Sequence, residues 1–275
     1  MLFSELFAVH LQQLKSGELS TAVEALIENA FAMNRSQFWI RKNQPVRDAA
    51  GLRKFRKHFA RLLAHEPLAY ILGEKEFFGE VFYVNPAVLI PRPETELLVE
   101  KALDLAGSKT LRILDIGAGS GNISVIMALK SAAQITAVDR SRPALRVLKK
   151  NIVRFGLQKR IRVMAADLFP KQNEPFDMII ANPPYLSGKE WRESPAGIKL
   201  FEPEAALLAG PTGTEVLARI IAGAPQHLTP CGHVLLEIGR GQLRAVRGFL
   251  KSARLREMDT ICDYSGIARV VVACR

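Results

Sequence analysis

Residues 111–122 read LRILDIGAGSGN, an apolar run that passes directly into a glycine-rich turn. The run predicts a buried strand over 111–116, and the residues after the turn predict a helix. Glycine lets the backbone of such a turn approach a ligand closely, and the first N–H groups of a helix have no partner within it. A strand, a glycine turn and a helix in this order predict a nucleotide-binding unit.

Strand–helix alternation continues from this stretch towards the C-terminal end. We expect strands at 111–116, 134–139, 161–166, 176–181, 233–238 and 268–274, and helices at 122–130, 142–155, 214–228 and 241–252. Alternation at this spacing predicts an α/β fold with a mostly parallel, doubly wound sheet. The segment 187–213 has weak periodicity and several Gly and Pro residues, which is typical of a substrate loop.

The chain divides into three expected parts: a helical bundle at 1–72, a β-hairpin linker at 73–92 and a larger domain at 93–275. Apolar residues recur at roughly helical spacing near the start, which predicts a small bundle. The hairpin is expected to turn near Gly79.

Basic residues crowd the segment 35–61 of the bundle, with Phe38 and Trp39 among them and only Asp48 against them. They are Arg35, Arg41, Lys42, Arg47, Arg53, Lys54, Arg56, Lys57 and Arg61. A face that docks RNA or an acidic protein surface would explain this pattern, and so would an ordinary solvated helix face.

The whole chain has 275 residues and a formal net charge of +11, which fits a protein that meets nucleic acid or a ribonucleoprotein, although charge for solubility alone stays open. The three cysteines are widely spaced, so neither a zinc site nor a disulfide framework is expected, and this suits the cytoplasm. The histidines have no metal-ligand spacing, so we expect no metal. We expect no secretory signal and no membrane-spanning run.

Asp139 ends the second expected strand, where a carboxylate can accept hydrogen bonds from two ribose hydroxyls. Two nucleotide cofactors compete for this pattern. The dinucleotide fingerprint would need glycine at Asn122, and Asp115 beside the loop would repel a pyrophosphate. The same carboxylate suits the cationic amino and sulfonium groups of S-adenosylmethionine, which we therefore favour over NAD. A purely structural glycine turn would not explain Asp139.

Asp167 follows the third expected strand. Its carboxylate is a candidate acceptor for the adenine amino group, with Leu168 packing near the ring. An ordinary helix N-cap is the alternative interpretation of Asp167.

Asn182-Pro183-Pro184-Tyr185 follows the fourth expected strand. The Asn182 side chain and the Pro183 carbonyl offer two acceptors, and the prolines hold them rigidly. Two acceptors suit a planar –NH2 group, and the Tyr185 ring can lie against a flat amide or base. A simple proline-rich turn is the alternative.

These motifs together resemble the class I S-adenosylmethionine-dependent methyltransferases that methylate amino groups. Further stretches resemble the peptide chain release factor glutamine methyltransferases; they lie at 65–73, 77–79, 89–96, 201–207 and 236–242. The resemblance runs from about residue 60 to the C-terminal end. Ala118, Leu168 and Gly210-Pro211-Thr212-Gly213 depart mildly from the family's pattern, which weakens the adenine contact expected at Leu168.

The resemblance implies a Rossmann-like, mostly parallel, seven-stranded sheet, preceded by a small helical bundle that docks the substrate. It implies methyl transfer from S-adenosylmethionine, with S-adenosylhomocysteine as product, to the side-chain amide nitrogen of the glutamine in a Gly-Gly-Gln tripeptide of class 1 release factors, which modulates translation termination. The expected cofactor residues are Asp115, Gly117, Ala118, Gly119, Ser120, Gly121, Asp139, Asp167, Leu168 and Asn182. The expected catalytic and substrate-binding residues are Asn182, Pro183, Pro184 and Tyr185.

Three other functions remain as alternatives. Adenine-N6 methylation of DNA would use the same grip on an amino group, but it needs base flipping and a DNA-reading domain, and no motif of such a domain is recognisable. Methylation of a glutamine in another protein is the second alternative. A non-catalytic RNA-binding module is supported by charge alone. We expect a monomer without sequence-specific binding of nucleic acid.

Overall fold

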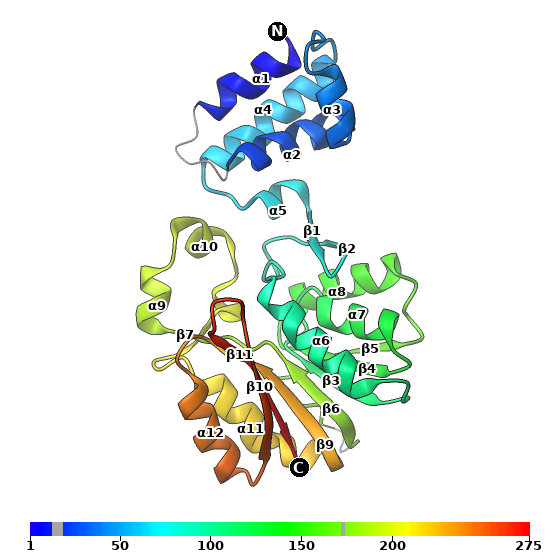
Figure 1. Cartoon of the computed structure of the whole chain (residues 1–275), viewed down its shortest axis with the longest axis vertical. Helices are drawn as coiled ribbons and strands as arrows, with labels where there is room; N and C mark the ends of the chain where they lie inside the picture. Colours follow the sequence, from blue (N-terminus) through cyan, green and yellow to red (C-terminus); the bar gives the residue numbers. More distant parts are fainter. Residues whose placement is uncertain (13–18, 172–173) are drawn as a thin grey trace. The chain divides into compact units, whose positions relative to one another are not determined.

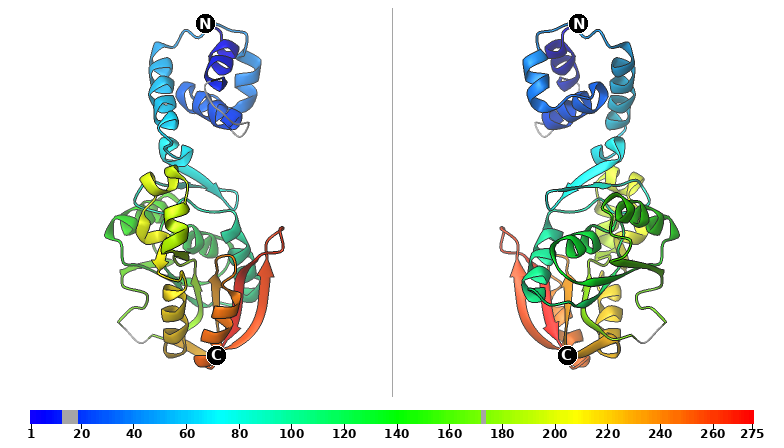
Figure 2. Two further views of the ribbon diagram at one scale, coloured as in Figure 1. Left: turned by 90° about the vertical axis from the view of Figure 1, so that its left-hand side faces the viewer. Right: turned by 90° about the vertical axis from the view of Figure 1, so that its right-hand side faces the viewer.

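The computed structural model describes residues 1–12, 19–171 and 174–275, and it divides the chain into two compact units. The first unit contains residues up to Gly73 together with Ala196–Phe201, and the second contains Glu74–Pro195 and Glu202–Arg275. Residues 13–18 of the expected helical bundle lie outside the described residues. Figures 1 and 2 show the helices and strands of which the two units are built. Each unit has its own hydrophobic core.

The first unit is helical, as the sequence predicts. Its helices are α1 (Phe3–Leu11), α2 (Leu19–Phe31), α3 (Arg35–Arg41), α4 (Ala49–Leu63), α5 (Leu68–Leu72) and α10 (Ala196–Phe201). The Asp48 side chain caps α4 by accepting from the N–H groups of Ala50 and Gly51. Phe38, Phe55 and other large apolar side chains fill the core between the helices.

Gly51 lies where α4 packs against the end of α2. A Cβ atom at this position would lie 2.5 Å from Cδ1 of Phe31 and 2.6 Å from Oδ2 of Asp48. Both distances are below van der Waals contact, so only glycine allows the two helices to pack this tightly.

The second unit opens with a hairpin of β1 (Glu74–Phe77) and β2 (Glu80–Tyr83), which turns at Phe78 and Gly79. Both turn residues have positive φ, 55° and 77°, as a tight two-residue hairpin turn requires. Phe77 and Phe82 point from the hairpin into the core of the second unit.

The remaining elements of the second unit form the doubly wound fold expected from the sequence. They are α6 (Glu94–Ala106), β3 (Arg112–Ile116), α7 (Asn122–Lys130), β4 (Gln134–Asp139), α8 (Arg142–Arg154), β5 (Ile161–Ala165), β6 (Phe176–Ala181), β7 (Leu186–Ser187), α9 (Gly188–Glu193), the 3₁₀ turn η1 (Glu204–Ala206), β8 (Leu208–Gly210), α11 (Glu215–His227), β9 (Leu228–Glu237), α12 (Leu243–Ser252), β10 (Arg256–Cys262) and β11 (Ala268–Cys274).

The central sheet has seven strands in the order β10-β11-β9-β6-β3-β4-β5. The five strands from β9 to β5 are parallel, whereas β11 is antiparallel to both of its neighbours. Successive residues of a strand face opposite sides, so Ile113 joins the core beneath α6, α7 and α8, while Leu114 joins the core beneath α11 and α12 (Figure 1).

The sequence did not predict every element. It missed β10, whose residues are mostly exposed or half-buried, because an edge strand lacks the apolar run of a central one. It also missed the short helices α3 and α5 and the two-stranded pairing of β7 with β8. The strands that carry the motifs lie within a residue or two of their predicted bounds, except β9, which begins five residues early.

We predict that Gly51→Ala lowers the free energy of unfolding by about 1–3 kcal/mol, because the added methyl group overpacks the α2–α4 contact. Gly248→Ala in α12 is the matched control, since a Cβ atom there meets nothing within 4 Å. The control should be stabilised by roughly 0.5–1 kcal/mol through helix propensity. Urea unfolding followed by circular dichroism measures both variants, and equal effects at the two positions would contradict the packing argument.

Candidate active site

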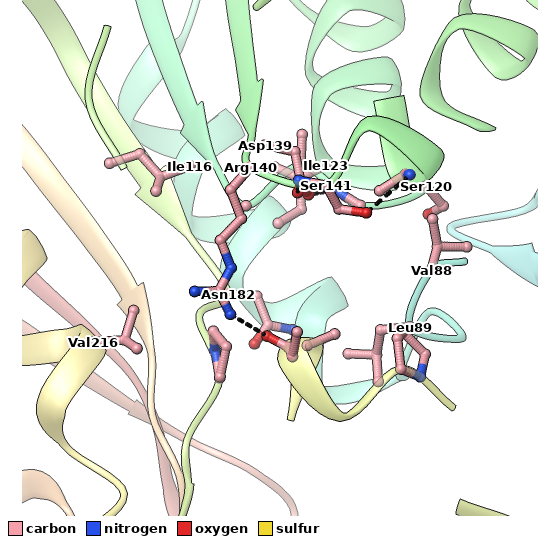
Figure 3. A pocket seen from close by; sticks show the side chains of 18 of the residues that line it. Val88, Leu89, Ile116, Ser120, Ile123, Asp139, Arg140, Ser141, Asn182 and Val216 are labelled. Atoms are coloured by element: carbon pink, nitrogen blue, oxygen red, sulfur yellow. Dashed lines mark hydrogen bonds between the residues drawn. The ribbon is translucent and has the colours of Figure 1, made fainter. Parts of the chain in front are cut away.

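A pocket opens at the carboxyl ends of β3, β4 and β6. The chain leaves β3 for α7 on one face of the sheet, and the segments after β6 lead to α11 on the other face. Two adjacent parallel strands that diverge in this way create the crevice where open α/β sheets bind ligands. Figure 3 shows Asp139 and Ser141 on one side of the pocket and Asn182 across from them.

The glycine-rich loop after β3 is held by backbone geometry. Gly117, Gly119 and Gly121 have φ values of 73°, 54° and 84°, which favour glycine strongly. The N–H groups of Gly117 and Ala118 donate to the Val138 carbonyl at 2.9 and 3.0 Å, which fixes the loop against the end of β4. Gly117, Ala118, Gly119 and Ser120 line the pocket.

Gly121 has a packing role. It does not line the pocket, and a Cβ atom there would collide with the Leu148 side chain of α8. The third glycine therefore allows the start of α7 to pack closely against α8.

Asp139 at the end of β4 lines the pocket and holds two backbone groups. Its Oδ2 accepts from the N–H of Gly119 at 3.0 Å, and its Oδ1 accepts from the N–H of Ser141 at 2.7 Å. Each carboxylate oxygen has further acceptor capacity, so the side chain can bind ligand hydroxyls while it braces the loop.

Asn151 of α8 ties the glycine loop to the hairpin. Its Nδ2 donates to the carbonyl of Ser120 at 2.8 Å and to that of Tyr83 at 2.9 Å, while its Oδ1 accepts from the N–H of Tyr83. The side chain is fully buried, so the loop and the end of β2 share one rigid support.

Asp115 lies outside the pocket lining, although the sequence placed it beside the cofactor loop. Its carboxylate is only 1% exposed and accepts a hydrogen bond from the Ser124 hydroxyl at 2.5 Å. Burial raises the pKa of Asp115 to about 7, and its Oδ1 has no hydrogen-bond partner among the described groups.

Asp167 and Leu168 both line the pocket. Oδ2 of Asp167 pairs with the Arg219 guanidinium at 2.6 Å, a partner that the sequence did not suggest. Between Asp167 and β6, no helix begins in the part of the chain that the structure describes, so the N-cap interpretation is wrong. Leu168 has a φ of 70°, an unusual backbone conformation for a leucine.

Asn182 is the polar centre of the opposite wall. Its Nδ2 donates to Thr95 Oγ1 at 2.9 Å, and both residues line the pocket. The Thr95 hydroxyl in turn donates to Oε2 of Glu237 at 2.7 Å. Oδ1 of Asn182 is buried and has no hydrogen-bond partner among the described groups, which leaves it available as an acceptor.

The rest of the Asn-Pro-Pro-Tyr motif is held from behind. Pro184 lines the pocket, whereas Pro183 and Tyr185 do not. Nε2 of Gln242 donates to the Tyr185 carbonyl at 2.8 Å and to the Gly213 carbonyl at 3.0 Å. Burial raises the pKa of the Tyr185 hydroxyl, so the ring stays neutral at physiological pH.

An ion pair joins two other segments of the wall. The Arg92 guanidinium lies 2.5 Å from Oε1 of the buried Glu202, whose Oε2 accepts from the N–H of Ile90. The pair brings the segment that follows Glu202 beside Val88 and Leu89, and both segments line the pocket.

The sequence assigned no role to Thr95, Glu237, Arg92 or Glu202, although each lies in a stretch quoted for the family resemblance. It gave Arg140 and Arg219 of the pocket no role either. Within the described residues there is no group of three or more His, Cys, Asp or Glu side chains that could hold a metal ion, and no helix is long and apolar enough to cross a membrane.

Two family models match the chain. The PrmC N-terminal domain matches residues 6–73, and the methyltransferase small domain matches residues 93–210. The first match covers most of the helical unit, and the second covers the pocket from α6 to β8.

Curated relatives match over most of the chain. A release factor glutamine methyltransferase of Bordetella pertussis is 40% identical over 258 residues, covering 90% of this chain and 93% of the relative. A protein of the same name from Nitratidesulfovibrio vulgaris is 36% identical and covers 96% and 92%. A solved methyltransferase from Pyrococcus furiosus shares the fold with a TM-score of 0.56 and 18% identity, covering 79% of this chain and 98% of that one.

We predict that Asp115→Asn flattens the pH dependence of stability. A carboxyl with a pKa of about 7 when folded and a usual value near 4 when unfolded retains a proton that the unfolded chain loses. The free energy of unfolding therefore falls as pH rises from about 4 to about 7, by up to about 1.4 kcal/mol per pH unit. An amide at this position does not titrate, so Asp115→Asn would remove the contribution of Asp115 to the pH dependence of the unfolding free energy. Asp104→Asn, at an exposed side chain, is the control and should leave that pH dependence unchanged.

Urea unfolding at pH 5, 6 and 7 measures the slope for both variants. A slope in Asp115→Asn that equals that of the wild type would contradict the raised pKa.

Proposed function

The chain belongs to the family of release factor glutamine methyltransferases, and from this premise we propose how its pocket performs the reaction. The enzyme is an S-adenosylmethionine-dependent methyltransferase that acts on a glutamine of a release factor. The roles of individual residues, the tripeptide that is methylated and the docking of the substrate are parts of the proposal.

The residues of the pocket fit S-adenosylmethionine. Asp139 offers acceptor capacity for the ribose hydroxyls at the end of β4, where nucleotide-binding folds place such a carboxylate. The backbone of the glycine loop faces the pocket without side chains at Gly117 and Gly119. Leu168, Ile123 and Val88 give apolar surface that suits an adenine ring.

Two of the expected cofactor residues act indirectly in this proposal. Asp115 supports the loop from behind through Ser124, and Gly121 permits the close packing of α7 on α8. Oδ2 of Asp167 pairs with Arg219, and its Oδ1 retains acceptor capacity for an adenine amino group.

The orphaned Oδ1 of Asn182 is the single observation that carries the proposal for the substrate. A buried acceptor without a donor costs free energy unless a ligand supplies one. A glutamine amide has two N–H groups, and we assign one to this Oδ1 and the other to the Pro183 carbonyl, which lies in the backbone between the pocket-lining residues Asn182 and Pro184. Held in this way, the amide presents its nitrogen to the pocket.

Bound S-adenosylmethionine supplies a methyl group on an electrophilic sulfonium. The lone pair of an amide nitrogen is delocalised into its carbonyl, so orientation by Asn182 and Pro183 does much of the catalytic work. Positive charge grows on the nitrogen as it becomes tetrahedral, and the two acceptor oxygens stabilise it there. No side chain is assigned as a general base, and the proton leaves to water.

The target that we propose is the side-chain amide nitrogen of the glutamine in the Gly-Gly-Gln tripeptide of class 1 release factors, in the cytoplasm. The helical unit, with its basic residues between Arg35 and Arg61, would dock the factor, and the enzyme would act as a monomer without sequence-specific nucleic-acid binding. Adenine in DNA is the competing acceptor, because the same two oxygens would bind an exocyclic amino group.

Asp139→Ala should weaken cofactor binding by about tenfold to a hundredfold, because two hydrogen bonds to an ionised group are lost and the loop loses its brace. Isothermal titration with S-adenosylhomocysteine measures the dissociation constant. Asp104→Ala, at an exposed side chain of α6, is the matched control. An unchanged affinity in Asp139→Ala would contradict the assignment of the ribose contact.

Asn182→Ala should lower kcat by about 10²–10³, the usual loss when a group that stabilises developing charge is removed, while cofactor affinity falls only a few-fold. Labelled S-adenosylmethionine is supplied with three acceptors: a release factor, the same factor with alanine in place of its Gly-Gly-Gln glutamine, and DNA. Label should enter the first alone. Label in DNA alone, or wild-type turnover in Asn182→Ala, would overturn the proposal.

A further inference from the structure

We propose that Thr95 and Glu237 are positioning residues that hold the Asn182 side chain with its oxygen towards the substrate, and that they thereby select an amide –NH2 over a carboxylate. This inference rests on the proposed function, in which Oδ1 of Asn182 accepts from the substrate. The residues come from three separate elements, since Thr95 lies on α6, Glu237 ends β9 and Asn182 follows β6.

An asparagine side chain can flip and exchange its oxygen for its –NH2 group, and the two orientations have the same shape. Something must therefore decide which group faces the pocket. Here Nδ2 donates to Thr95 Oγ1 at 2.9 Å, and a flipped side chain would need Thr95 to donate instead. A hydroxyl has one hydrogen, and the Thr95 hydrogen is already directed to Glu237 at 2.7 Å.

The ionised Glu237 carboxylate can only accept, so it fixes the direction of the whole chain of hydrogen bonds. Glu237 accepts the hydrogen bond from the Thr95 hydroxyl, so Thr95 can only accept a hydrogen bond from Asn182. Thr95 is 1% and Glu237 3% exposed, so water does not compete for these contacts. The orientation of Asn182 thus depends on the charge of Glu237, which acts on Asn182 through the Thr95 hydroxyl.

The protonation state of Glu237 sets the pH range over which Thr95 and Glu237 hold Asn182 in this orientation. Burial, and then Glu94, raise the pKa of Glu237 to about 7, against the hydrogen bond from Thr95 and the charges of Arg269 and Arg92, which lower it. The negative charge of Glu237 also helps to raise the pKa of the Tyr185 hydroxyl, which stays neutral. Protonated Glu237 could donate to Thr95, which would free the Thr95 hydrogen for a flipped Asn182.

The consequence for the substrate follows from hydrogen-bond polarity. An outward oxygen at Asn182 accepts from a glutamine –NH2 but opposes the oxygens of a glutamate. A flipped Asn182 would present its –NH2 group, which donates to the oxygens of a glutamate and opposes the –NH2 group that must be methylated. Sites with fixed hydrogen-bond polarity reject mismatched analogues strongly, because buried groups are left unpaired.

The test compares full-length Thr95→Val, Thr95→Ser and Glu237→Gln with the wild type. Valine keeps the shape of threonine without its hydroxyl, and serine restores the hydroxyl. Thr110→Val and Glu100→Gln, at exposed positions, are the matched controls. Each protein is assayed for kcat and for its affinity towards release factors that carry Gly-Gly-Gln or Gly-Gly-Glu, with S-adenosylhomocysteine affinity as the check on folding and cofactor binding.

At pH 8 we expect the wild type, Thr95→Ser and both controls to prefer glutamine over glutamate by about tenfold or more. Thr95→Val should reduce this preference to about threefold or less and lower kcat at least about tenfold, with cofactor affinity within about twofold of the wild type. The wild-type preference should fall between pH 8 and pH 6, where free glutamate stays ionised. In Glu237→Gln it should be reduced and independent of pH.

If Thr95→Val kept the wild-type kcat and the wild-type preference for glutamine over glutamate, the positioning role of Thr95 would be overturned. A preference that still depended on pH in Glu237→Gln would overturn the role of Glu237. These outcomes leave the proposed function intact, provided that the wild type methylates the Gly-Gly-Gln factor. A wild type that does not methylate this factor would instead overturn the proposed function itself.

Discussion

The parallel register of β3 with its two neighbours is the constraint on which the site depends. Ile116 pairs with Val138 of β4 on one side and with Ala181 of β6 on the other. The next residue along each strand is therefore Gly117, Asp139 or Asn182, and the three meet at one edge of the sheet. The glycine loop, Asp139 and Asn182 are adjacent because backbone hydrogen bonds between the strands fix their register. Their adjacency does not require contacts between side chains of the pocket. A slip of one residue would separate them and turn every side chain to the other face.

Much of this arrangement could be predicted from local sequence. The apolar runs, the positive-φ glycines and the acidic or amide residues that follow each strand are signals within about ten residues, and the carboxyl ends of parallel strands meet by rule. The partners of those residues could not be predicted in the same way. Thr95 and Glu237 are 142 residues apart in the chain, and no periodicity links them. Asp115 was assigned to the ligand because it precedes the loop, but its carboxylate is buried behind the loop and bonds to α7. The edge strand β10 could not be predicted because its residues are mostly exposed or half-buried, so the strand has no continuous apolar run.

The second unit keeps two buried carboxyl groups whose pKa values are raised to about 7, Asp115 and Glu237. Both lie directly behind groups that line the pocket, and each costs free energy when it is ionised. Their presence beneath the loop and behind Asn182 is the kind of local cost that proteins retain at functional sites.

The support that Asn151 gives to both Ser120 and Tyr83 bears on how such enzymes can be recombined. The hairpin is bonded to the wall of the cofactor loop and buries Phe77 and Phe82 in the catalytic core, so in mechanical terms it is part of the methyltransferase half. A chimaera that exchanges the segment from α1 to α5 between relatives should therefore be joined ahead of Glu74. A junction placed after β2 would import a foreign hairpin, whose side chains in place of Phe77 and Phe82 would have to fit this core and whose backbone would have to meet Asn151.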